Sequence, residues 1–311
     1  MTLFLPSVVG ATGSGKTKLS LLVAQQLELE IVNADSRQIY RGFDRGTAKP
    51  TAAEQAMCPH HLIDAADPEE RYSAAHFGAE ARRIAEEIHA RGHIPLLVGG
   101  SGLYLRAAEE GLFEGPAASP AIRTRLRARV QQEGALSLHR ELERIDPKAA
   151  ARLSPQDVIR LVRALEVHEL TGIPISEHHA RHRRQSRVRA LRFGIDWDPQ
   201  VLAERIEQRV DAMLSGGWIE EVEALLARGI PEDAPAWNAV GYAPVRDLVR
   251  GHASHEATRQ LIVTATRQYA KRQRTWFRAV QPIRWLKVAS EDDFPALAGE
   301  IARRLRPEHG P

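Results

Sequence analysis

The chain has 311 residues, 43% of them hydrophobic and 27% charged, which is typical of a globular protein and excludes a disordered chain. The formal charge of +3 is too small to indicate a partner, and the single cysteine, Cys58, excludes internal disulfides and thiolate metal clusters. No apolar run approaches the roughly 20 residues of a membrane span, and no signal peptide precedes the first predicted strand, so we expect a cytoplasmic protein without a membrane partner.

Strands and helices alternate through the first hundred residues. The apolar run 4–9 predicts a first strand, which Pro6 marks as strained or edge-like at its start. A glycine-rich turn and an amphipathic helix follow. Residues 30–34 and 94–98 predict further strands, and residues 79–91 predict a helix between them. Because continuous apolar strands separated by helices indicate a parallel sheet with covered faces, we expect an α/β core.

The pattern becomes helical after a loop rich in glycine and proline at 115–120 and stays so until about Thr171. The basic stretch 181–189 has no apolar period and predicts a loop. Residues 190–195 and 283–288 predict strands that return to the sheet, with helices between them. The predicted architecture is a parallel-sheet core of residues 1–115 and 189–311, with helices on both faces, interrupted by a helical insertion over 116–188.

The predicted insertion is the basic part of the chain. Residues 116–190 contain 15 Lys and Arg against 8 Asp and Glu, so the remainder is slightly acidic. Clustered arginine gains affinity for phosphates by releasing counterions, which favours a polyanionic partner at this segment. A solvated, arginine-rich helical face explains the same pattern and remains an alternative.

The glycine-rich turn matches a phosphate-binding loop. Gly10-Ala11-Thr12-Gly13-Ser14-Gly15-Lys16-Thr17 has the spacing G-x-x-x-x-G-K-[ST] and stands between a strand and a helix. Glycines let the backbone amides point inward, the helix start contributes free N–H groups, and Lys16 adds a charge. All eight residues are candidate contacts to a diphosphate or a nucleotide such as ATP, and the Thr17 hydroxyl is a candidate Mg²⁺ ligand.

A carboxylate is predicted near this loop. Asp35 ends the strand 30–34, whereas the strand 94–98 ends in Gly99-Gly100-Ser101-Gly102 and lacks the acid that supports the metal in common P-loop kinases. Ligands of open α/β sheets bind beyond the carboxyl ends of the strands, so Asp35 and Ser101 should face the loop's crevice. Asp35 is then placed to take a proton from an acceptor, although helix capping by Asp35 or Ser36 is an alternative.

Segments along nearly the whole chain resemble the tRNA dimethylallyltransferases, or IPP transferases, and the related cytokinin-forming isopentenyltransferases. The matching segments are DSRQIYRG (35–42), GTAKP (46–50), PHHLID (59–64), GGSGLY (99–104), RALEV (163–167), RIEQRV (205–210), VGY (240–242) and KRQRTWF (271–277). The basic insertion resembles the tRNA-clasping helical domain of the tRNA enzymes. The chain departs from the usual family residues at Ala11, Gly13, Ser101 and Ile159, where the family has Pro, Ala, Thr and Gln.

The resemblance implies transfer of a dimethylallyl group from dimethylallyl diphosphate to the exocyclic amine of the adenine 3′ of the anticodon, with release of pyrophosphate. It implies a catalytic set of Asp35, Thr17, Arg209 and Ser101, with Asp35 as proton acceptor and Arg209 beside the departing diphosphate. Implied contacts to the tRNA anticodon stem-loop are Asp35, Ser36, Arg37, Gln38, Ser101, Arg123, Ile159, Arg160, Leu161, Val162, Arg163, Lys271, Arg274 and Arg278.

Two other functions are compatible with parts of the pattern. A P-loop kinase of a small metabolite would turn over ATP without RNA, and a nucleotide-regulated RNA-binding protein would catalyse nothing. The missing acid after Val98 argues against the first, and Asp35 beside an anion site argues against the second. The basic stripe of Arg267, Lys271, Arg274 and Arg278 could equally be a solvated helix face. We expect a monomer.

Overall fold

The computed structural model describes residues 2–112, 115–183, 188–280 and 282–306. The chain divides into two compact units, one formed by residues 1–109 with 187–311 and the other by residues 110–186. The second unit therefore begins before the boundary predicted at residue 116 and ends two residues before the one predicted at 188.

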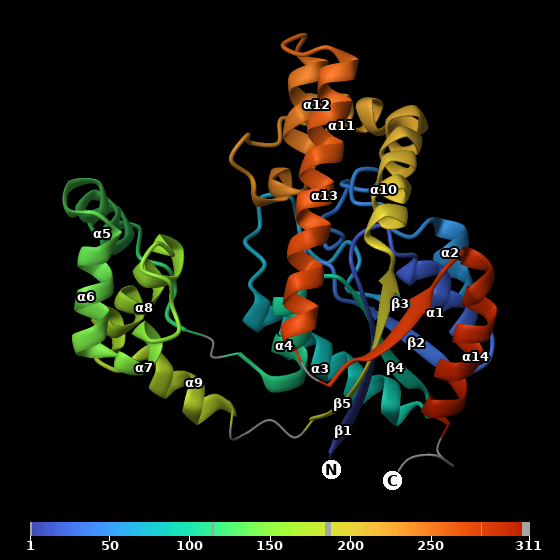
Figure 1. The fold of residues 1–311 in the computed structure, drawn as a ribbon, viewed down its shortest axis with the longest axis horizontal. Coiled ribbons are helices and arrows are strands. Elements are labelled where there is room, and N and C mark those ends of the chain that lie inside the picture. The colour runs from blue at the N-terminus through green and yellow to red at the C-terminus, as the bar shows by residue number, and fades with distance from the viewer. Residues whose placement is uncertain (1, 113–114, 184–187, 281, 307–311) are drawn as a thin grey trace. The chain divides into compact units, whose positions relative to one another are not determined.

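The described strands of the first unit form one parallel sheet in the order β3-β2-β4-β1-β5-β6 (Figure 1). The strands are β1 (Leu3–Val9), β2 (Leu29–Asn33), β3 (His60–His61), β4 (Ile94–Gly99), β5 (Val188–Trp197) and β6 (Arg284–Val288). The prediction of an α/β fold with a parallel sheet is confirmed. The short strand β3 is absent from the sequence prediction, because two residues carry no readable period.

Pro6 lies in a central strand, so the edge position predicted for it is wrong. β1 has β4 on one side and β5 on the other. The pairing of β1 with β4 begins only at Ser7. Pro6, which has no backbone N–H to donate, therefore precedes the hydrogen-bonded part of this strand pair. Nε2 of His89 lies 2.8 Å from the carbonyl oxygen of Phe4, which gives this part of the strand a side-chain partner.

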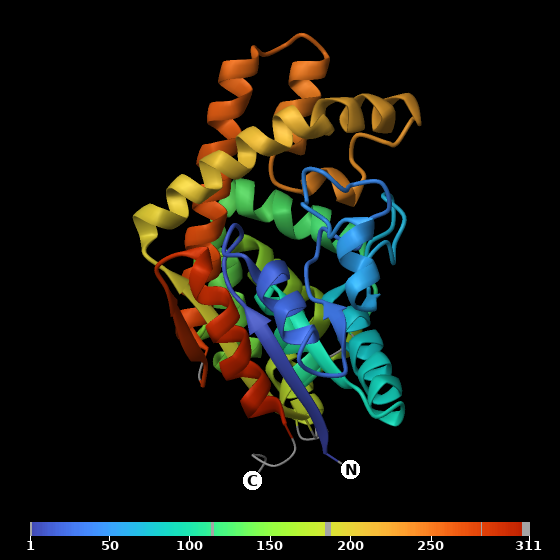
Figure 2. The same cartoon turned by 90° about the vertical axis from the view of Figure 1, so that its right-hand side faces the viewer.

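Helices cover both faces of the sheet. The helices of this unit are α1 (Lys16–Ala24), α2 (Ala52–Met57), α3 (Ala74–Ala90), α4 (Gly102–Glu110), α10 (Pro199–Met213), α11 (Ile219–Ala227), α12 (Tyr242–Val249), α13 (His255–Ala279) and α14 (Phe294–Leu305), with the π-helix η1 (Leu214–Trp218) and the 3₁₀ helices η2 (Pro235–Asn238) and η3 (Glu291–Asp293). Helices α11 and α12 pack against each other beyond the ends of the strands. The crossovers through α1 and α3 run in opposite directions along the sheet, so right-handed connections place them on opposite faces. Figure 2 shows α14 beside α1. Among the described helices, including the 25-residue α13, none has both the length and the apolar character of a membrane span.

The second unit is helical and has a core of its own. Its helices are α5 (Pro120–Glu133), α6 (Ala135–Ile145), α7 (Pro147–Ala150), α8 (Val158–Thr171) and α9 (Ile175–Arg183). Its buried core residues are Leu126, Leu138, Leu142, Ala149, Ala150, Leu161, Val162, Ala164 and Leu165. The prediction of a loop over 181–189 is wrong at both ends, because α9 continues to Arg183 and β5 begins at Val188; residues 184–187 lie outside the described residues.

Candidate active site

The loop between β1 and α1 has the backbone geometry of an anion cradle. Gly13 and Gly15 have φ values of 78° and 84°, a left-handed conformation that favours glycine. A Cβ atom at Gly15 would also lie 2.6 Å from the ring of Phe294. Helix α1 begins directly after Gly15, and no side chain caps it. Its first backbone amides therefore remain available to an anion.

Two half-buried cations and one carboxylate come together at this loop. Nζ of Lys16 donates a hydrogen bond to the carbonyl oxygen of Ala11 at 2.9 Å. Burial lowers the pKa of Lys16 to about 8, although the nearby Asp35 favours its charged form and Arg209 opposes it. Burial also lowers the pKa of Arg209, and Asp35 again acts in the other direction. Lys16, Arg209 and Asp35 come from three elements, and their excess positive charge suits an anionic ligand.

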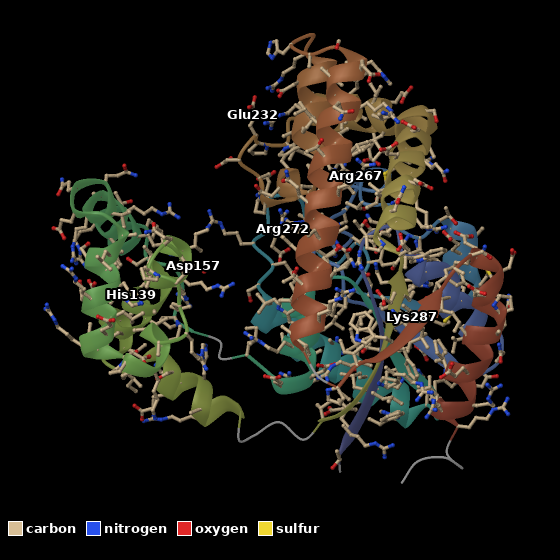
Figure 3. All side chains as sticks on the ribbon, viewed as in Figure 1. His139, Asp157, Glu232, Arg267, Arg272 and Lys287 are labelled. Atoms are coloured by element: carbon tan, nitrogen blue, oxygen red, sulfur yellow. The ribbon has the colours of Figure 1, made fainter. Side chains whose placement is uncertain are left out.

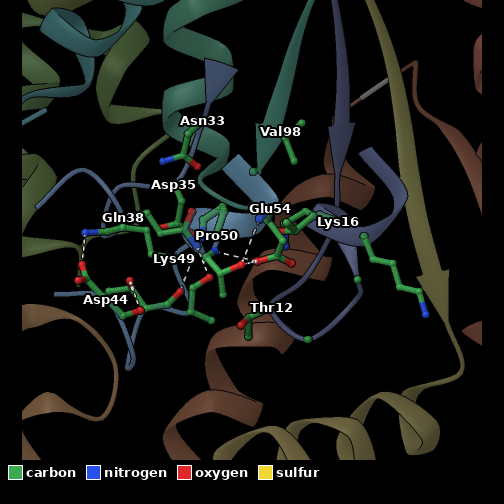
Figure 4. Close-up of a pocket in the computed structure, with 18 of the residues that line it drawn as sticks. Thr12, Lys16, Asn33, Asp35, Gln38, Asp44, Lys49, Pro50, Glu54 and Val98 are labelled. Atoms are coloured by element: carbon green, nitrogen blue, oxygen red, sulfur yellow. Dashed lines mark hydrogen bonds and ion pairs between the residues drawn. The ribbon is translucent and has the colours of Figure 1, made fainter. Parts of the chain in front are cut away.

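A cavity of about 460 Å³ surrounds these groups (Figure 4). Of the eight loop residues predicted to bind phosphate, five line it: Thr12, Gly13, Gly15, Lys16 and Thr17. Gly10, Ala11 and Ser14 are not among the lining residues. Ser14 is buried, and its carbonyl oxygen accepts a hydrogen bond from Nε1 of Trp197 at 3.0 Å. The part of the loop open to an anion therefore runs from Thr12 to Thr17, with Ser14 turned away.

A second cavity of about 290 Å³ adjoins the first. Its walls include Ser36, Arg37, Tyr269 and Arg272. Burial, followed by the nearby Asp35, raises the pKa of Tyr269 to about 12, so its hydroxyl stays protonated and can donate a hydrogen bond. The residues that line both cavities are Thr12, Asp35, Thr47, Arg209 and Met213. Asp35 thus lies between a basic chamber and one with aromatic and polar walls.

The loop after β4 holds the backbone on both sides of Asp35. The carbonyl oxygen of Ala34 accepts a hydrogen bond from the Ser101 amide at 3.2 Å, and Oγ of Ser101 accepts one from the Ser36 amide at 2.9 Å. Oδ1 of Asp35 accepts a hydrogen bond from the Arg37 amide at 2.8 Å within a turn, not at a helix start. Ser101 is not among the residues that line either cavity, but its side chain bonds Ser36 and Tyr269, which line the second one, so its catalytic role stays a prediction.

Residues 44–49 form a wall that both cavities share, and side chains from elsewhere hold it. Oε2 of Glu221 accepts hydrogen bonds from the amides of Asp44 and Arg45 at 3.0 and 2.7 Å. Nε2 of Gln38 donates to the carbonyl oxygens of Thr47 and Ala48 at 3.1 and 2.9 Å. Gln38, predicted to contact RNA, therefore supports this wall through its side chain.

In the helical unit, two of the predicted RNA contacts are tied to a buried glutamate. Glu166 has no exposed side-chain surface, and its oxygens accept hydrogen bonds from Arg123 at 2.8 and 2.9 Å and from Arg163 at 2.7 Å. Burial alone would raise the pKa of Glu166, but the two guanidinium groups hold it below its usual value. Arg123 and Arg163 therefore stabilise this unit, whatever else they bind.

The segment 159–163 divides into exposed and buried side chains. Ile159 is 79% exposed, and the side chain of Arg160 is 71% exposed while it pairs with Asp157 at 3.2 Å. Leu161 and Val162 are core residues, 0% and 3% exposed. The prediction that Leu161 and Val162 contact RNA is wrong for their side chains, because helix periodicity turns them toward the core.

The predicted basic stripe and the cavities lie on different faces of α13. Lys271, Arg274 and Arg278 line a groove beside α10, and Arg274 and Arg278 lie 3.8 Å from Asp196. Tyr269 and Arg272 line the second cavity instead. Figure 3 shows Arg267, a member of the stripe, and Arg272 on opposite sides of α13. Tyr269, Arg272 and the buried Gln273 were missed as site residues, although the last two belong to the family-like segment 271–277.

Comparisons with known proteins cover both units. A family profile described as IPP transferase matches residues 38–280. The chain is 44% identical over 281 residues to tRNA dimethylallyltransferase 1 of Pelobacter propionicus, covering 90% of this chain and 91% of the relative. It is 43% identical over 287 residues to tRNA dimethylallyltransferase of Geobacter sulfurreducens, covering 92% of each.

Solved structures with similar folds have related descriptions. The tRNA isopentenylpyrophosphate transferase of Bacillus halodurans has a TM-score of 0.70 at 38% identity and covers 97% of each chain. A eukaryotic dimethylallyltransferase, described as acting on tRNA, has a TM-score of 0.76 at 26% identity and covers 96% of this chain and 77% of its own.

Proposed function

The chain belongs to the IPP transferase family, and on that premise we propose that it transfers a dimethylallyl group from dimethylallyl diphosphate to tRNA. The acceptor is the exocyclic amine of the adenine 3′ of the anticodon, and the leaving group is pyrophosphate. The observation that carries the proposal is the position of Asp35 between the two cavities. A diphosphate suits the basic cavity, a nucleobase suits the other, and the carboxylate lies where the two would meet.

The basic cavity supplies what a departing diphosphate requires. As the bond between carbon and the diphosphate oxygen breaks, negative charge grows on pyrophosphate, and preorganised donors stabilise it. The free amides at the start of α1, Lys16 and Arg209 are such donors. Because Lys16 and Arg209 are half-buried, water screens their charges less than it screens charges on the open surface.

The carboxylate of Asp35 acts on the acceptor. The amine nitrogen attacks carbon, forms the new C–N bond and becomes positively charged, and Asp35 accepts its surplus proton. The proton then passes to solvent. The hydrogen bonds that fix Ala34 and Ser36 keep this carboxylate at one place relative to the glycine-rich loop, so orientation contributes to the rate.

We propose Mg²⁺ as the cofactor. Thr17 lines the basic cavity next to Lys16, and the described residues contain no cluster of three His, Cys, Asp or Glu that could hold a metal. This composition fits Mg²⁺, which commonly binds through one or two protein oxygens, substrate phosphates and water. When bound at Thr17, the ion would add positive charge next to the diphosphate oxygens.

The RNA must present its base to the second cavity. An adenine in an anticodon loop is stacked, and extruding it costs a few kcal/mol. We propose that backbone contacts from the helical unit, with the exposed Arg160 among them, offset that cost. Arg37 and Arg272 would contact the RNA at the cavity itself. A cytoplasmic location is proposed because the substrate is tRNA.

Mass spectrometry of tRNA tests the proposal. Unmodified tRNA is incubated with the protein, Mg²⁺ and dimethylallyl diphosphate, and the expected result is a gain of one C5 unit. Unchanged tRNA with a folded preparation that binds tRNA would contradict the proposal and favour a non-catalytic RNA-binding protein. Consumption of ATP with no RNA present would favour a small-metabolite kinase instead.

A further inference from the structure

One buried side chain bridges the two glycine-rich loops of the site. Gln273 on α13 is 6% exposed. Its Oε1 accepts a hydrogen bond from the Thr12 amide at 2.8 Å, and its Nε2 donates one to the Gly100 carbonyl oxygen at 2.9 Å. A backbone amide only donates and a carbonyl oxygen only accepts, so these two partners fix the orientation of the side-chain amide.

The two loops that Gln273 joins position different groups of the proposed reaction, the diphosphate and the proton acceptor. Thr12 belongs to the diphosphate loop and lines both cavities. Gly100 belongs to the loop whose next residue, Ser101, bonds the carbonyl oxygen of Ala34 and the amide of Ser36. Asp35 lies between those two residues. A side chain that bonds both loops therefore links the loop that binds the diphosphate to the turn that carries the proton acceptor.

We infer that Gln273 is a positioning residue that sets the placement of the diphosphate loop relative to Asp35. The inference rests on the proposed function, because the placement of the loop relative to Asp35 affects catalysis only if both take part in prenyl transfer. It also assigns the amide of Thr12 to Gln273 and not to the diphosphate. The phosphate donors of the loop then begin after Thr12, among Gly13, Gly15, Lys16 and Thr17, which line the cavity together with Thr12.

Helix α13 packs closely against the loop that contains Gly100. A Cβ atom at Gly100 would lie 2.3 Å from Nε2 of Gln273, and one at Gly102 would lie 2.3 Å from the ring of Trp276. Helix α13 therefore approaches this loop as closely as glycine permits. Glutamine supplies one donor and one acceptor on a single planar group, whereas leucine supplies neither and an ionised glutamate supplies two acceptors.

A first experiment compares Gln273→Leu with Gln260→Leu, a control at an exposed glutamine of the same helix. Calorimetry measures the affinity for pyrophosphate in Mg²⁺, single-turnover kinetics measure transfer, and a filter assay measures tRNA affinity. We expect Gln273→Leu to lose about tenfold in pyrophosphate affinity and roughly 100-fold in transfer rate, with unchanged tRNA affinity. Pyrophosphate affinity and rate equal to those of the control would overturn the inference.

A second variant decides the question even if Gln273→Leu fails to fold. In Gln273→Glu the protonated acid restores one donor and one acceptor, whereas the ionised form places an acceptor against the Gly100 carbonyl oxygen. The ratio of variant to wild-type pyrophosphate affinity should therefore rise as the pH falls from about 8 to about 5. A ratio that does not change with pH overturns the inference.

These binding measurements do not require prenyl transfer. A wild-type protein that binds pyrophosphate but leaves tRNA unmodified would contradict the proposed function, while the two Gln273 variants would still decide whether the side chain shapes the diphosphate loop. Conversely, a wild-type protein that modifies tRNA, together with a Gln273→Leu variant that matches Gln260→Leu, would sustain the proposed function and reject the inference.

Discussion

The hydroxyl of Ser101 accepts a hydrogen bond from the backbone amide of Ser36 at 2.9 Å and lies 3.2 Å from the Ser36 hydroxyl. Ser101 comes from the loop after β4, and Ser36 comes from the turn after β2, so this pair joins the ends of two neighbouring strands. The residue before Ser36 is Asp35. We therefore propose that the Ser101 hydroxyl helps to fix the placement of the proton acceptor.

Removing that hydroxyl should slow transfer without removing the acceptor itself. We expect Ser101→Ala to lower the single-turnover rate by about tenfold, because the turn that carries Asp35 loses a hydrogen bond. Ser101→Thr keeps the hydroxyl and should stay close to the wild-type rate. If Ser101→Ala and Ser101→Thr transfer equally fast, the hydroxyl has no positioning role.

Asp35 should affect the chemical step far more than RNA binding. We expect Asp35→Ala to lower kcat by two or more decades, since general base catalysis contributes about 10²–10⁴-fold, while tRNA affinity remains nearly intact. Asp35→Asn, which keeps the shape but not the basicity, should show the same loss. A large loss of tRNA affinity with normal kcat would reassign Asp35 to RNA binding.

Lys16 should make diphosphate binding depend on pH. Burial lowers the pKa of Lys16 to about 8 in the free protein, and the protonated form binds the anion. As the pH rises above 8, the free protein loses this proton, so pyrophosphate affinity relative to Lys16→Met should fall by up to about tenfold per pH unit. Taking the ratio removes the titration of pyrophosphate itself. Calorimetry between about pH 7 and 9.5 that finds a constant ratio would contradict this role of Lys16.

The arginines of the helical unit should separate into contacts and supports. We expect Arg160→Ala to weaken tRNA binding and to reduce the salt dependence of binding by about one phosphate contact, with no change in unfolding. Arg163→Ala should destabilise the unit by about 3 kcal/mol, because the fully buried Glu166 loses a partner. Salt-dependent binding measures the first effect, and denaturant unfolding measures the second. An Arg163→Ala protein as stable as the wild type would show that the Arg163–Glu166 ion pair does not stabilise the fold.

Two neighbouring residues of α13 test which face of the helix meets RNA. Arg272 lines the second cavity, and Lys271 lines the groove beside α10. We expect Arg272→Ala to lower kcat/KM for tRNA by about tenfold and Lys271→Ala to lower it by no more than about twofold. The opposite order would show that the basic stripe, and not the cavity side, faces the RNA.

Local patterns predicted the parts of the site that lie within one segment. The glycine-rich loop and Asp35 could be predicted because a fixed spacing or a strand end defines them. The role of Gln273 could not, because its partner Thr12 is 261 positions away and the family-like segment 271–277 that contains Gln273 does not indicate that partner. The role of Arg163 was also hidden, since its partner Glu166 looks like an ordinary surface acid until the fold buries it. The side of the molecule that the basic stripe faces could not be predicted either, because it follows from the packing of α13 against α10.

A structure of the protein with an unreactive dimethylallyl diphosphate analogue, Mg²⁺ and an anticodon stem-loop RNA would test the central claim most directly. The distance to measure joins the Asp35 carboxylate to the exocyclic nitrogen of the adenine 3′ of the anticodon. We predict a hydrogen bond of about 2.6–3.2 Å, with the diphosphate in the glycine-rich loop. A carboxylate turned away from an adenine bound there, or a base held outside the second cavity, would contradict the account.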